Sequence, residues 1–364
     1  MGFDFLTLEK HFVNSNAFHS EELIDNSYKG IFYFKVVAFK DIYQKINLIT
    51  VVNDMPFVIS GYKFFDDDKF DYFIVRCDEP LLYNGILYYF ELEDESGNFK
   101  YLGKNGVTEE EWKVEDFEYL PGKVDSDSDL FEKAGNVFGI ADDMDISFFK
   151  EIGISNLIVD KKVDCSDIVC YDKKEIYSQS SISDENFNKK MNDFFIKKNI
   201  SSRDFIKLIG VDIFKSSILS SYFRFFKIDI NMKDNVVDNK LAIAFQLTFI
   251  GMPLISENIK SLPRELISYY KNMISIRNSN EILKKGDIRF IFSDTDVFGF
   301  ERFINNDRLL IFFNRSDESY VIDVTKYFGN GDFIDISKEH PLKRKRQFSI
   351  YAKDFVILKK TRER

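Results

Sequence analysis

The sequence predicts a multidomain α+β protein with a β-sandwich at each end and an incomplete α/β core between them. Residues 28–102 are rich in aromatic and β-branched residues interrupted by turn residues, and strand patterns return from residue 286 onward. Between them, residues 143–159 read as a helix, a glycine and a short apolar strand. We therefore predict these boundaries: an N-terminal extension over 1–27, an N-terminal β-sandwich over 28–120, an α/β core over 121–280 and a C-terminal antiparallel β-sandwich over 281–364.

Composition supports a folded chain and excludes some classes of function. The 364 residues are 45% hydrophobic and 30% charged, and the net charge is −10. That charge argues against a general nucleic-acid binder. The 40 phenylalanines indicate either drift in an AT-rich genome or an unusually aromatic core.

The chain shows no signal for a membrane, a metal or a disulfide. Its start, MGFDFLTLEKHF, lacks an apolar run, and the longest apolar stretch, Leu241–Ile255, is too short to cross a bilayer. We expect a cytoplasmic protein without membrane contact. Cysteines 77, 165 and 170 are odd in number, and histidines 11, 19 and 340 lie far from them, so we predict neither a metal site nor a cofactor.

The N-terminal sandwich is predicted from alternating aromatic and β-branched residues. Asp66–Asp68 and Asp94–Asn98 supply turn residues between the strands. The candidate strands are Gly30–Lys40, Tyr43–Val52, Phe57–Lys63, Phe70–Arg76 and Ile86–Glu93.

The middle of the chain carries helical patterns after an acidic linker, residues 121–135. Gly153 ends a helix over Asp143–Glu151 and leads into the strand Asn156–Val159. Amphipathic helices are predicted over Asp184–Lys198 and Arg264–Arg277. The last third is predicted as strands: Arg289–Phe292, Val297–Phe303, Arg308–Asn314, Tyr320–Val324, Asp332–Ile336 and Phe348–Leu358.

One stretch carries a family resemblance. Residues 241–324 read as an apolar helix, the Gly-x-Pro corner of GMPLIS, the amphipathic helix of PRELISYYKNMISIRNSN and a run of hairpins. This order resembles the end of the barrel and the start of the C-terminal domain in glycoside hydrolase family 13, the α-amylase family, in its neopullulanase and cyclomaltodextrinase branch. Residues 83–101 resemble a hairpin of that family's N-terminal domain.

The resemblance implies an enzyme that retains anomeric configuration with a carboxylate nucleophile, a Glu acid and a second Asp. Those residues are not found here. If Ile218–Phe226 is the seventh barrel strand, Tyr222 and Phe223 occupy the positions of the family's His-Asp pair, and Arg224 keeps the position of the Arg. An Arg-x-Asp nucleophile motif fails too, because Phe226 stands two positions after Arg224.

The resemblance also implies a site for sugar. Tyr171 and Asp172 resemble the Tyr-Asp pair that the family places at its first glucose subsite, although Val169 and Cys170 replace the preceding His; the alternative is a turn with an incidental Tyr-Asp. We predict substrate-binding roles for Tyr171, Asp172 and Arg224, and no catalytic residue.

Length indicates a shortened core. A (β/α)₈ barrel takes about 250 residues and rarely fewer than about 200, whereas only 154 residues run from Val124 to Arg277. The predicted fold is therefore an incomplete TIM-barrel remnant, with no recognisable first strand near Glu118–Lys123.

Three functions remain open. The first is a non-catalytic relative that binds α-glucan or maltooligosaccharide, or that forms a homodimer or a complex with an active paralogue. Exposed aromatic side chains would support it, with Trp112, Tyr119 and Tyr83 as candidates. The second is an active hydrolase of α-1,4 or α-1,6 glucans with relocated carboxylates, such as the pairs Asp142-Asp143 and Asp294/Asp296. The third is an interaction protein unrelated to sugar.

Overall fold

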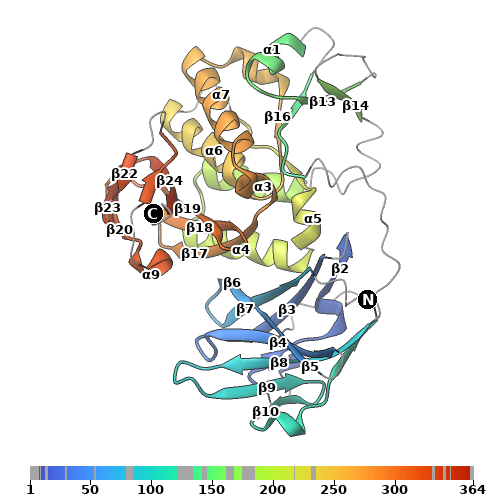
Figure 1. Cartoon of the computed structure of the whole chain (residues 1–364). Coiled ribbons are helices and arrows are strands. Elements are labelled where there is room, and N and C mark those ends of the chain that lie inside the picture. The colour runs from blue at the N-terminus through green and yellow to red at the C-terminus, as the bar shows by residue number, and fades with distance from the viewer. Residues whose placement is uncertain are drawn as a thin grey trace. The chain divides into compact units, whose positions relative to one another are not determined.

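The computed structural model contains two compact units, which are described separately (Figure 1). Unit 1 comprises Met1–Ser128 and Gly210–Leu219, and unit 2 comprises Asp129–Ile209 and Ser220–Arg364. The structure describes residues 8, 10–12, 15–28, 31–52, 55–78, 85–120, 134–141, 146–160, 168–173, 185–216, 218–230, 235–329, 333–338, 342–344 and 346–360.

Unit 1 is a β-sandwich. One sheet has the order β1-β3-β7-β6, with β2 paired to β3, and the other has the order β10-β9-β8-β4-β5, with β11 paired to β8. The strands are β1 (Ala17–Phe18), β2 (Ile24–Tyr28), β3 (Ile31–Phe39), β4 (Lys45–Val52), β5 (Met55–Ser60), β6 (Tyr62–Asp66), β7 (Phe70–Cys77), β8 (Ile86–Glu93), β9 (Phe99–Gly103), β10 (Gly106–Thr108) and β11 (Phe117–Tyr119).

Alternation along these strands forms the core. Phe34 and Phe73 of the first sheet and Leu48 and Phe90 of the second belong to one buried cluster. The predicted strand Phe57–Lys63 is wrong, because it divides at Gly61 into β5 and β6, which lie in different sheets. A Cβ at Gly61 would lie 2.9 Å from the Ile74 carbonyl oxygen, so this bend requires glycine.

The predicted turns of unit 1 are confirmed by their hydrogen bonds. One Asp67 carboxylate oxygen accepts from the backbone N–H groups of Lys69 and Phe70, each at 2.8 Å. One Asp94 oxygen accepts from those of Ser96 and Asn98 at 2.8 and 2.9 Å. The short Asp side chains replace the backbone partners that each reversal removes.

Unit 2 contains a parallel sheet in the order β14-β13-β12-β16-β15. Its strands are β12 (Phe138–Ile140), β13 (Asn156–Val159), β14 (Val169–Asp172), β15 (Phe225–Phe226) and β16 (Met252–Ile255). The helices of the middle region are α1 (Ile146–Glu151), α3 (Glu185–Phe195), α4 (Ser202–Lys215), α5 (Ile218–Tyr222), α6 (Val236–Thr248), α7 (Arg264–Asn278) and α8 (Glu281–Lys285).

Two sequence signals in unit 2 are confirmed. Gly153 has φ +93° after α1, and its N–H bonds to the Lys150 carbonyl at 3.0 Å. Gly251 has φ +112° in the Gly-x-Pro corner between α6 and β16. The predicted helices over 184–198 and 264–277 correspond to α3 and α7, whereas α4 was not predicted.

The C-terminal part of unit 2 is a second sandwich. A six-stranded antiparallel sheet, β17-β18-β19-β24-β21-β22, packs against the pair β20–β23 through a buried cluster that includes Ile322 and Ile350. Its elements are β17 (Asp287–Ser293), β18 (Val297–Ile304), β19 (Asp307–Asn314), β20 (Tyr320–Asp323), α9 (Thr325–Phe328), β21 (Phe333–Asp335), β22 (Leu342–Arg344), β23 (Gln347–Ile350) and β24 (Asp354–Lys360).

Two features of this sandwich bear on the predictions. Phe348–Leu358 was predicted as one strand, but Lys353 at φ +51° separates β23 from β24. Phenylalanines join the large sheet to the helices: Phe194 and Phe205 stack at 3.9 Å, and Phe298 lies 5.5 Å from Phe194. Much of the phenylalanine in unit 2 is therefore core.

Candidate functional site at the carboxyl edge of the parallel sheet

The carboxyl ends of the five parallel strands meet at one edge of the sheet, where α/β folds usually place their sites. β13 ends at Val159, β14 at Asp172, β15 at Phe226 and β16 at Ile255. Of the three residues predicted to bind substrate, Tyr171 and Asp172 are the last residues of β14 at this edge, whereas Arg224 precedes β15 and lies at the opposite end of its strand.

Tyr171 lies on β14, opposite Ile158 of β13, and not in a turn. Its ring is half-buried and packs on a small cluster formed by Phe138, Ile158, Phe225, Met252 and Leu254. Its hydroxyl is 3.5 Å from the Asn156 side-chain oxygen. Tyr171 therefore contributes part of its surface to the packing of the sheet.

Asp172 is the last residue of β14 and pairs with Val159. Beside it, the Lys173 ammonium lies 3.3 Å from the Asp160 carboxylate, and both side chains are largely exposed. An exposed pair of this kind contributes at most about 1 kcal/mol. This corner of the edge thus carries three charged groups that face or border solvent.

Arg224 lies between α5 and β15, on the opposite flank of the sheet from β14. The side chain is 7% exposed, and the guanidinium carbon lies 4.4 Å from the centroid of the Phe187 ring on α3. The Arg224 carbonyl accepts from the Met252 N–H at 2.9 Å. These contacts hold Arg224 in the wall of the core and fix the start of β15.

The predicted seventh strand, Ile218–Phe226, is wrong over most of its length. Ile218–Tyr222 is helix α5, and only Phe225–Phe226 pair with β16. The Asp25 carboxylate accepts from the N–H of Ile218 at 2.7 Å, as an acid does at the start of a helix. This partner is 193 residues away, so local sequence does not reveal it.

Tyr222 stands at the position expected for the family's His, but its side chain has a structural role. Its hydroxyl donates to the buried Asp287 carboxylate at the start of β17. Phe223, at the expected position of the Asp, packs on the same apolar cluster as Tyr171. Neither side chain supplies an acid or a base to the edge.

Among the acids near this edge, Asp229 has structural partners. Asp229, three residues after β15, accepts from the Asn192 side-chain amide at 2.8 Å and donates its N–H to Asn192 at 2.9 Å. Asp142 and Asp143 lie outside the described residues. Within the described part of the chain, no three His, Cys, Asp or Glu side chains are grouped to hold a metal ion.

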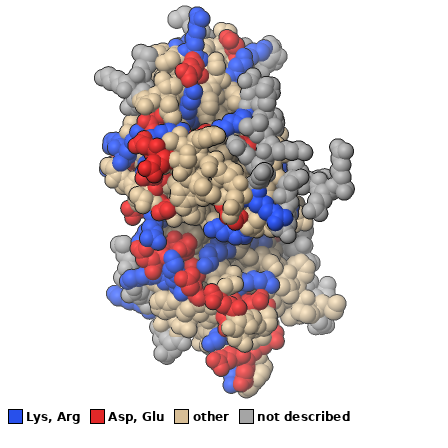
Figure 2. Space-filling model, turned by 90° about the vertical axis from the view of Figure 1, so that its left-hand side faces the viewer, with Lys and Arg blue, Asp and Glu red and all other residues tan. Residues whose placement is uncertain are grey.

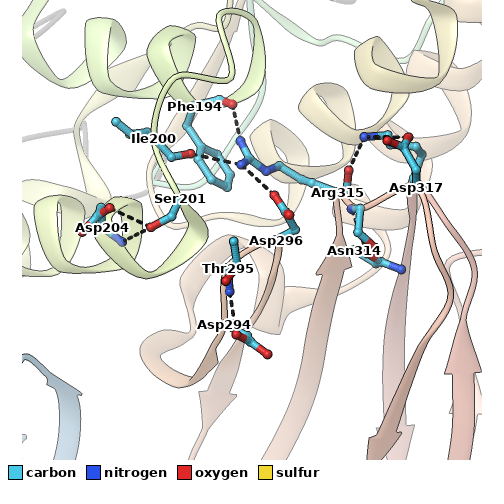
Figure 3. Close-up of polar contacts among 12 residues, drawn as sticks. Phe194, Ile200, Ser201, Asp204, Asp294, Thr295, Asp296, Asn314, Arg315 and Asp317 are labelled. Carbon is cyan, nitrogen blue, oxygen red and sulfur yellow. Dashed lines mark hydrogen bonds and ion pairs between the residues drawn. The ribbon is translucent and has the colours of Figure 1, made fainter.

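Asp294 and Asp296 lie in the turn between β17 and β18, away from the parallel sheet in the topology (Figure 3). Asp294 accepts from the Thr295 N–H at 2.7 Å. Asp296 lies 3.3 Å from Arg315. Both carboxylates therefore have local structural partners in the C-terminal sandwich.

Arg315 is a structural residue that sequence reasoning missed (Figure 3). Its guanidinium lies 3.7 Å from the Phe194 ring centroid and donates to the carbonyls of Phe194 and Ile200, at 2.5 and 3.1 Å. Burial lowers the pKa of Arg315, and Asp296 opposes that shift. The contacts tie the end of α3 to the turn that precedes β18.

On the face shown in Figure 2, basic and acidic side chains are interspersed, and neither sign forms one continuous field. No helix within the described residues is long and apolar enough to cross a membrane. Of the three aromatic candidates, Trp112 is 79% exposed, Tyr119 is buried and Tyr83 lies outside the described residues.

Comparison with solved structures defines the class of fold. A cyclomaltodextrinase has a TM-score of 0.69 at 11% identity, with 96% of this chain and 100% of that chain covered. A maltogenic amylase from S. marinus gives 0.67 at 11% identity, covering 94% and 82%. A type III pullulan hydrolase from Thermococcus kodakarensis gives 0.67 at 7% identity, covering 93% and 98%. At such identities the likeness establishes the fold.

Sequence comparison points to the same group. No protein-family model matches the chain. A cyclomaltodextrinase from Thermoanaerobacter pseudethanolicus is 25% identical over 190 residues, which are 43% of this chain and 32% of the relative. An amylopullulanase from Thermoanaerobacter thermohydrosulfuricus is 28% identical over 122 residues, which are 25% and 8%. The chain thus matches about a third or less of each relative's length.

Together these findings confirm the predicted resemblance to glycoside hydrolase family 13. The relatives and neighbours named above, cyclomaltodextrinases, an amylopullulanase, a maltogenic amylase and a pullulan hydrolase, agree with the predicted resemblance to the neopullulanase and cyclomaltodextrinase branch.

Proposed function

We propose that this chain is a non-catalytic relative of the α-amylase-family hydrolases that binds α-glucan without cleaving it. The observation that carries the proposal is the short stretch of chain between β14, which ends at Asp172, and α3, which begins at Glu185. A strand with its crossover takes about 30 residues in a βαβ unit. The intervening residues are too few for the barrel strands that would carry a nucleophile and an acid.

Strand order supports a barrel remnant. In a closed (β/α)₈ barrel the first strand pairs with both the second and the last. Here β12 pairs in parallel with β13, the next strand along the chain, and with β16, the last strand of the sheet. The order β14-β13-β12-β16-β15 then corresponds to strands three, two, one, eight and seven, with the three between them missing.

The chemistry of the edge supports loss of catalysis. Retaining hydrolysis needs two carboxylates about 5–5.5 Å apart, one ionised and one protonated. Asp229 is held by Asn192, and Asp160 is paired with Lys173. Tyr171 and Asp172 at this edge, and Arg224 before the start of β15, remain our candidates for contact with a sugar.

Two assays test the proposal. Purified protein incubated with maltoheptaose, β-cyclodextrin or pullulan should release no more reducing sugar than a protein-free blank. Turnover at an ordinary enzymatic rate, about 1–10³ s⁻¹, would contradict the non-catalytic assignment. In native gels containing glycogen or pullulan the protein should be retarded, and unchanged mobility in both gels would reject α-glucan binding.

Association is a second candidate function, which a specific surface favours. On the sheet β10-β9-β8-β4-β5, the inner face packs in the sandwich core, while Val51, Val58 and Leu87 are 62%, 55% and 57% exposed. Exposed apolar patches on sheets often mark interfaces. A homodimer or a complex with an active paralogue would cover it. Light scattering at micromolar concentration should show a mass above the 42.8 kDa of one chain. A monomer that also fails to bind an active relative would contradict the proposed association.

A further inference from the structure

Trp112, the only tryptophan of the chain, is the most exposed large apolar side chain among the described residues, at 79%. It lies in unit 1 on the 3₁₀ turn Glu111–Lys113, between β10 and β11. Leaving an indole in water forgoes a burial worth about 2 kcal/mol or more. An aromatic side chain held in that position is therefore a candidate contact for a ligand.

The turn that carries Trp112 is braced before any ligand arrives. The Asn105 side chain donates to the Lys113 carbonyl at 2.8 Å and accepts from the Glu115 N–H at 3.2 Å. The Lys113 ammonium lies 2.9 Å from the Glu110 carboxylate, and the Lys113 N–H bonds to the Glu110 carbonyl at 3.1 Å. A group held in place in advance loses less conformational freedom on binding.

Polar groups and further aromatic rings surround the indole. The Lys113 ammonium is 4.8 Å from the Trp112 ring centroid. The preceding residue, Glu111, accepts a hydrogen bond from the Tyr89 hydroxyl, and the Tyr89 ring lies 6.1 Å from that of Tyr101. Tyr89 and Tyr101 are on β8 and β9, whose outer face carries both rings. The turn thus offers a flat apolar surface beside ammonium, carboxylate and phenol groups.

We propose that Trp112 and the Glu110–Lys113 turn form a binding platform for the pyranose rings of a linear gluco-oligosaccharide. A pyranose has an apolar C–H face that stacks on an indole and equatorial hydroxyls that reach nearby carboxylate and ammonium groups. The core of a protein–protein interface is depleted of charged residues. The segment 109–116 instead carries Glu109, Glu110, Glu111, Lys113, Glu115 and Asp116.

This inference rests on the proposed glucan-binding function and adds a second place of binding, in unit 1, to the candidates of the parallel sheet. Because Trp112 is the only tryptophan, intrinsic fluorescence reports on the platform alone. We expect maltoheptaose to quench and shift this emission saturably. The Trp112→Ala variant should bind glycogen in affinity gels about tenfold or more weakly, and Trp112→Phe should retain part of the affinity. Tyr351→Ala, which removes another exposed aromatic ring, should bind like the parent chain.

The results distinguish a failure of the Trp112 platform from a failure of the proposed α-glucan binding. Glycogen retardation that survives Trp112→Ala, with unchanged fluorescence, overturns the platform and leaves α-glucan binding in place. Quenching by cellohexaose and not by maltoheptaose keeps a saccharide platform and rejects α-glucan as its ligand. If no oligosaccharide changes the fluorescence but Trp112→Ala abolishes oligomerisation, the platform is a protein contact and the proposal is wrong. Circular dichroism of each variant verifies folding.

Discussion

The two units bury positive charge in different ways. In unit 1 the Lys35 ammonium is 2.6 Å from the Asp25 carboxylate and 2.8 Å from the Phe214 carbonyl. In unit 2 the Arg277 guanidinium, which is fully buried, donates to four backbone carbonyls, those of Gly135, Leu247, Phe249 and Gly251, at 2.7–3.0 Å. The first cation is neutralised by a counterion, and the second is held only by converging peptide dipoles in these contacts.

The difference shows what holds each region together. The central strands of the sandwich pair over long stretches, as β3 and β7 do from Phe32 opposite Cys77 to Phe39 opposite Phe70, so one ion pair adds a single local contact. The parallel sheet has strands of two to four residues, which carry few ladder bonds. Arg302, near Arg277, donates to the carbonyls of Thr248 and Gly286 at 2.8 and 2.7 Å. The two arginines therefore fix the turns next to the parallel sheet. We infer that long polar side chains support the parallel sheet where its short strands supply few hydrogen bonds.

The largest expected effect is at Arg277. Arg277→Met should lower the free energy of unfolding of unit 2 by about 4–5 kcal/mol, because it leaves buried carbonyls without donors. Urea unfolding followed by tyrosine fluorescence and circular dichroism measures this. Arg264→Met, at an exposed position of the same helix, is the matched control and should change little. A loss below about 1 kcal/mol at Arg277 would refute the role assigned to the carbonyl contacts.

The ion pair of unit 1 should rank next. Lys35→Met alone should cost about 3–4 kcal/mol, because Asp25 stays buried without its counterion. The double variant Lys35→Met/Asp25→Asn should recover part of that loss. A double-mutant cycle on thermal unfolding gives the coupling energy. If the losses of stability in Lys35→Met and Asp25→Asn simply add, the two side chains act independently, which would contradict the ion pair between them.

His19 gives unit 1 a dependence on pH. Burial lowers the pKa of His19 to about 4, and a hydrogen bond to the Lys35 carbonyl only partly opposes this. The unfolded chain, with an ordinary pKa near 6.5, binds the proton more readily. The stabilisation is therefore fully present above pH 6.5 and is lost as the pH falls from about 6.5 to about 4, a change of roughly 3 kcal/mol.

Unfolding measured between pH 4 and 7 tests this window. His19→Gln should flatten the slope of stability against pH there, whereas His11→Gln should leave that slope in place. The same slope in His19→Gln as in the parent chain would assign the pH dependence to other groups.

The smallest expected effect is at Tyr222. Tyr222→Phe removes one donor from the buried Asp287 and should cost about 1.5–2 kcal/mol. Tyr351→Phe, at an exposed hydroxyl, should cost almost nothing. A neutral Tyr222→Phe would show that this hydrogen bond does not stabilise unit 2.

Sequence alone predicted the elements whose patterns are local. β7, β8, β18, β19 and α7 were expected within one or two residues, because alternation or helical periodicity lies inside each segment. Gly153 and Gly251 could be recognised in the sequence as a helix end and a corner, because only glycine adopts their backbone angles easily. The family resemblance over 241–324 also came from local order, and both comparisons agree with it.

Tertiary structure decided what depends on distant partners. β12 was not recognised as a strand, because its three residues are stabilised by β13 and by β16, more than 100 positions later. Helix α5 replaced a predicted strand because Asp25 accepts its first N–H and Asp287 binds Tyr222. Whether an aromatic side chain is buried, as at Tyr119 on β11, or exposed, as at Trp112 on the preceding turn, depends on which segments the fold packs against it. Composition and periodicity do not indicate these pairings, because the pairings form only when folding brings remote segments of the chain together.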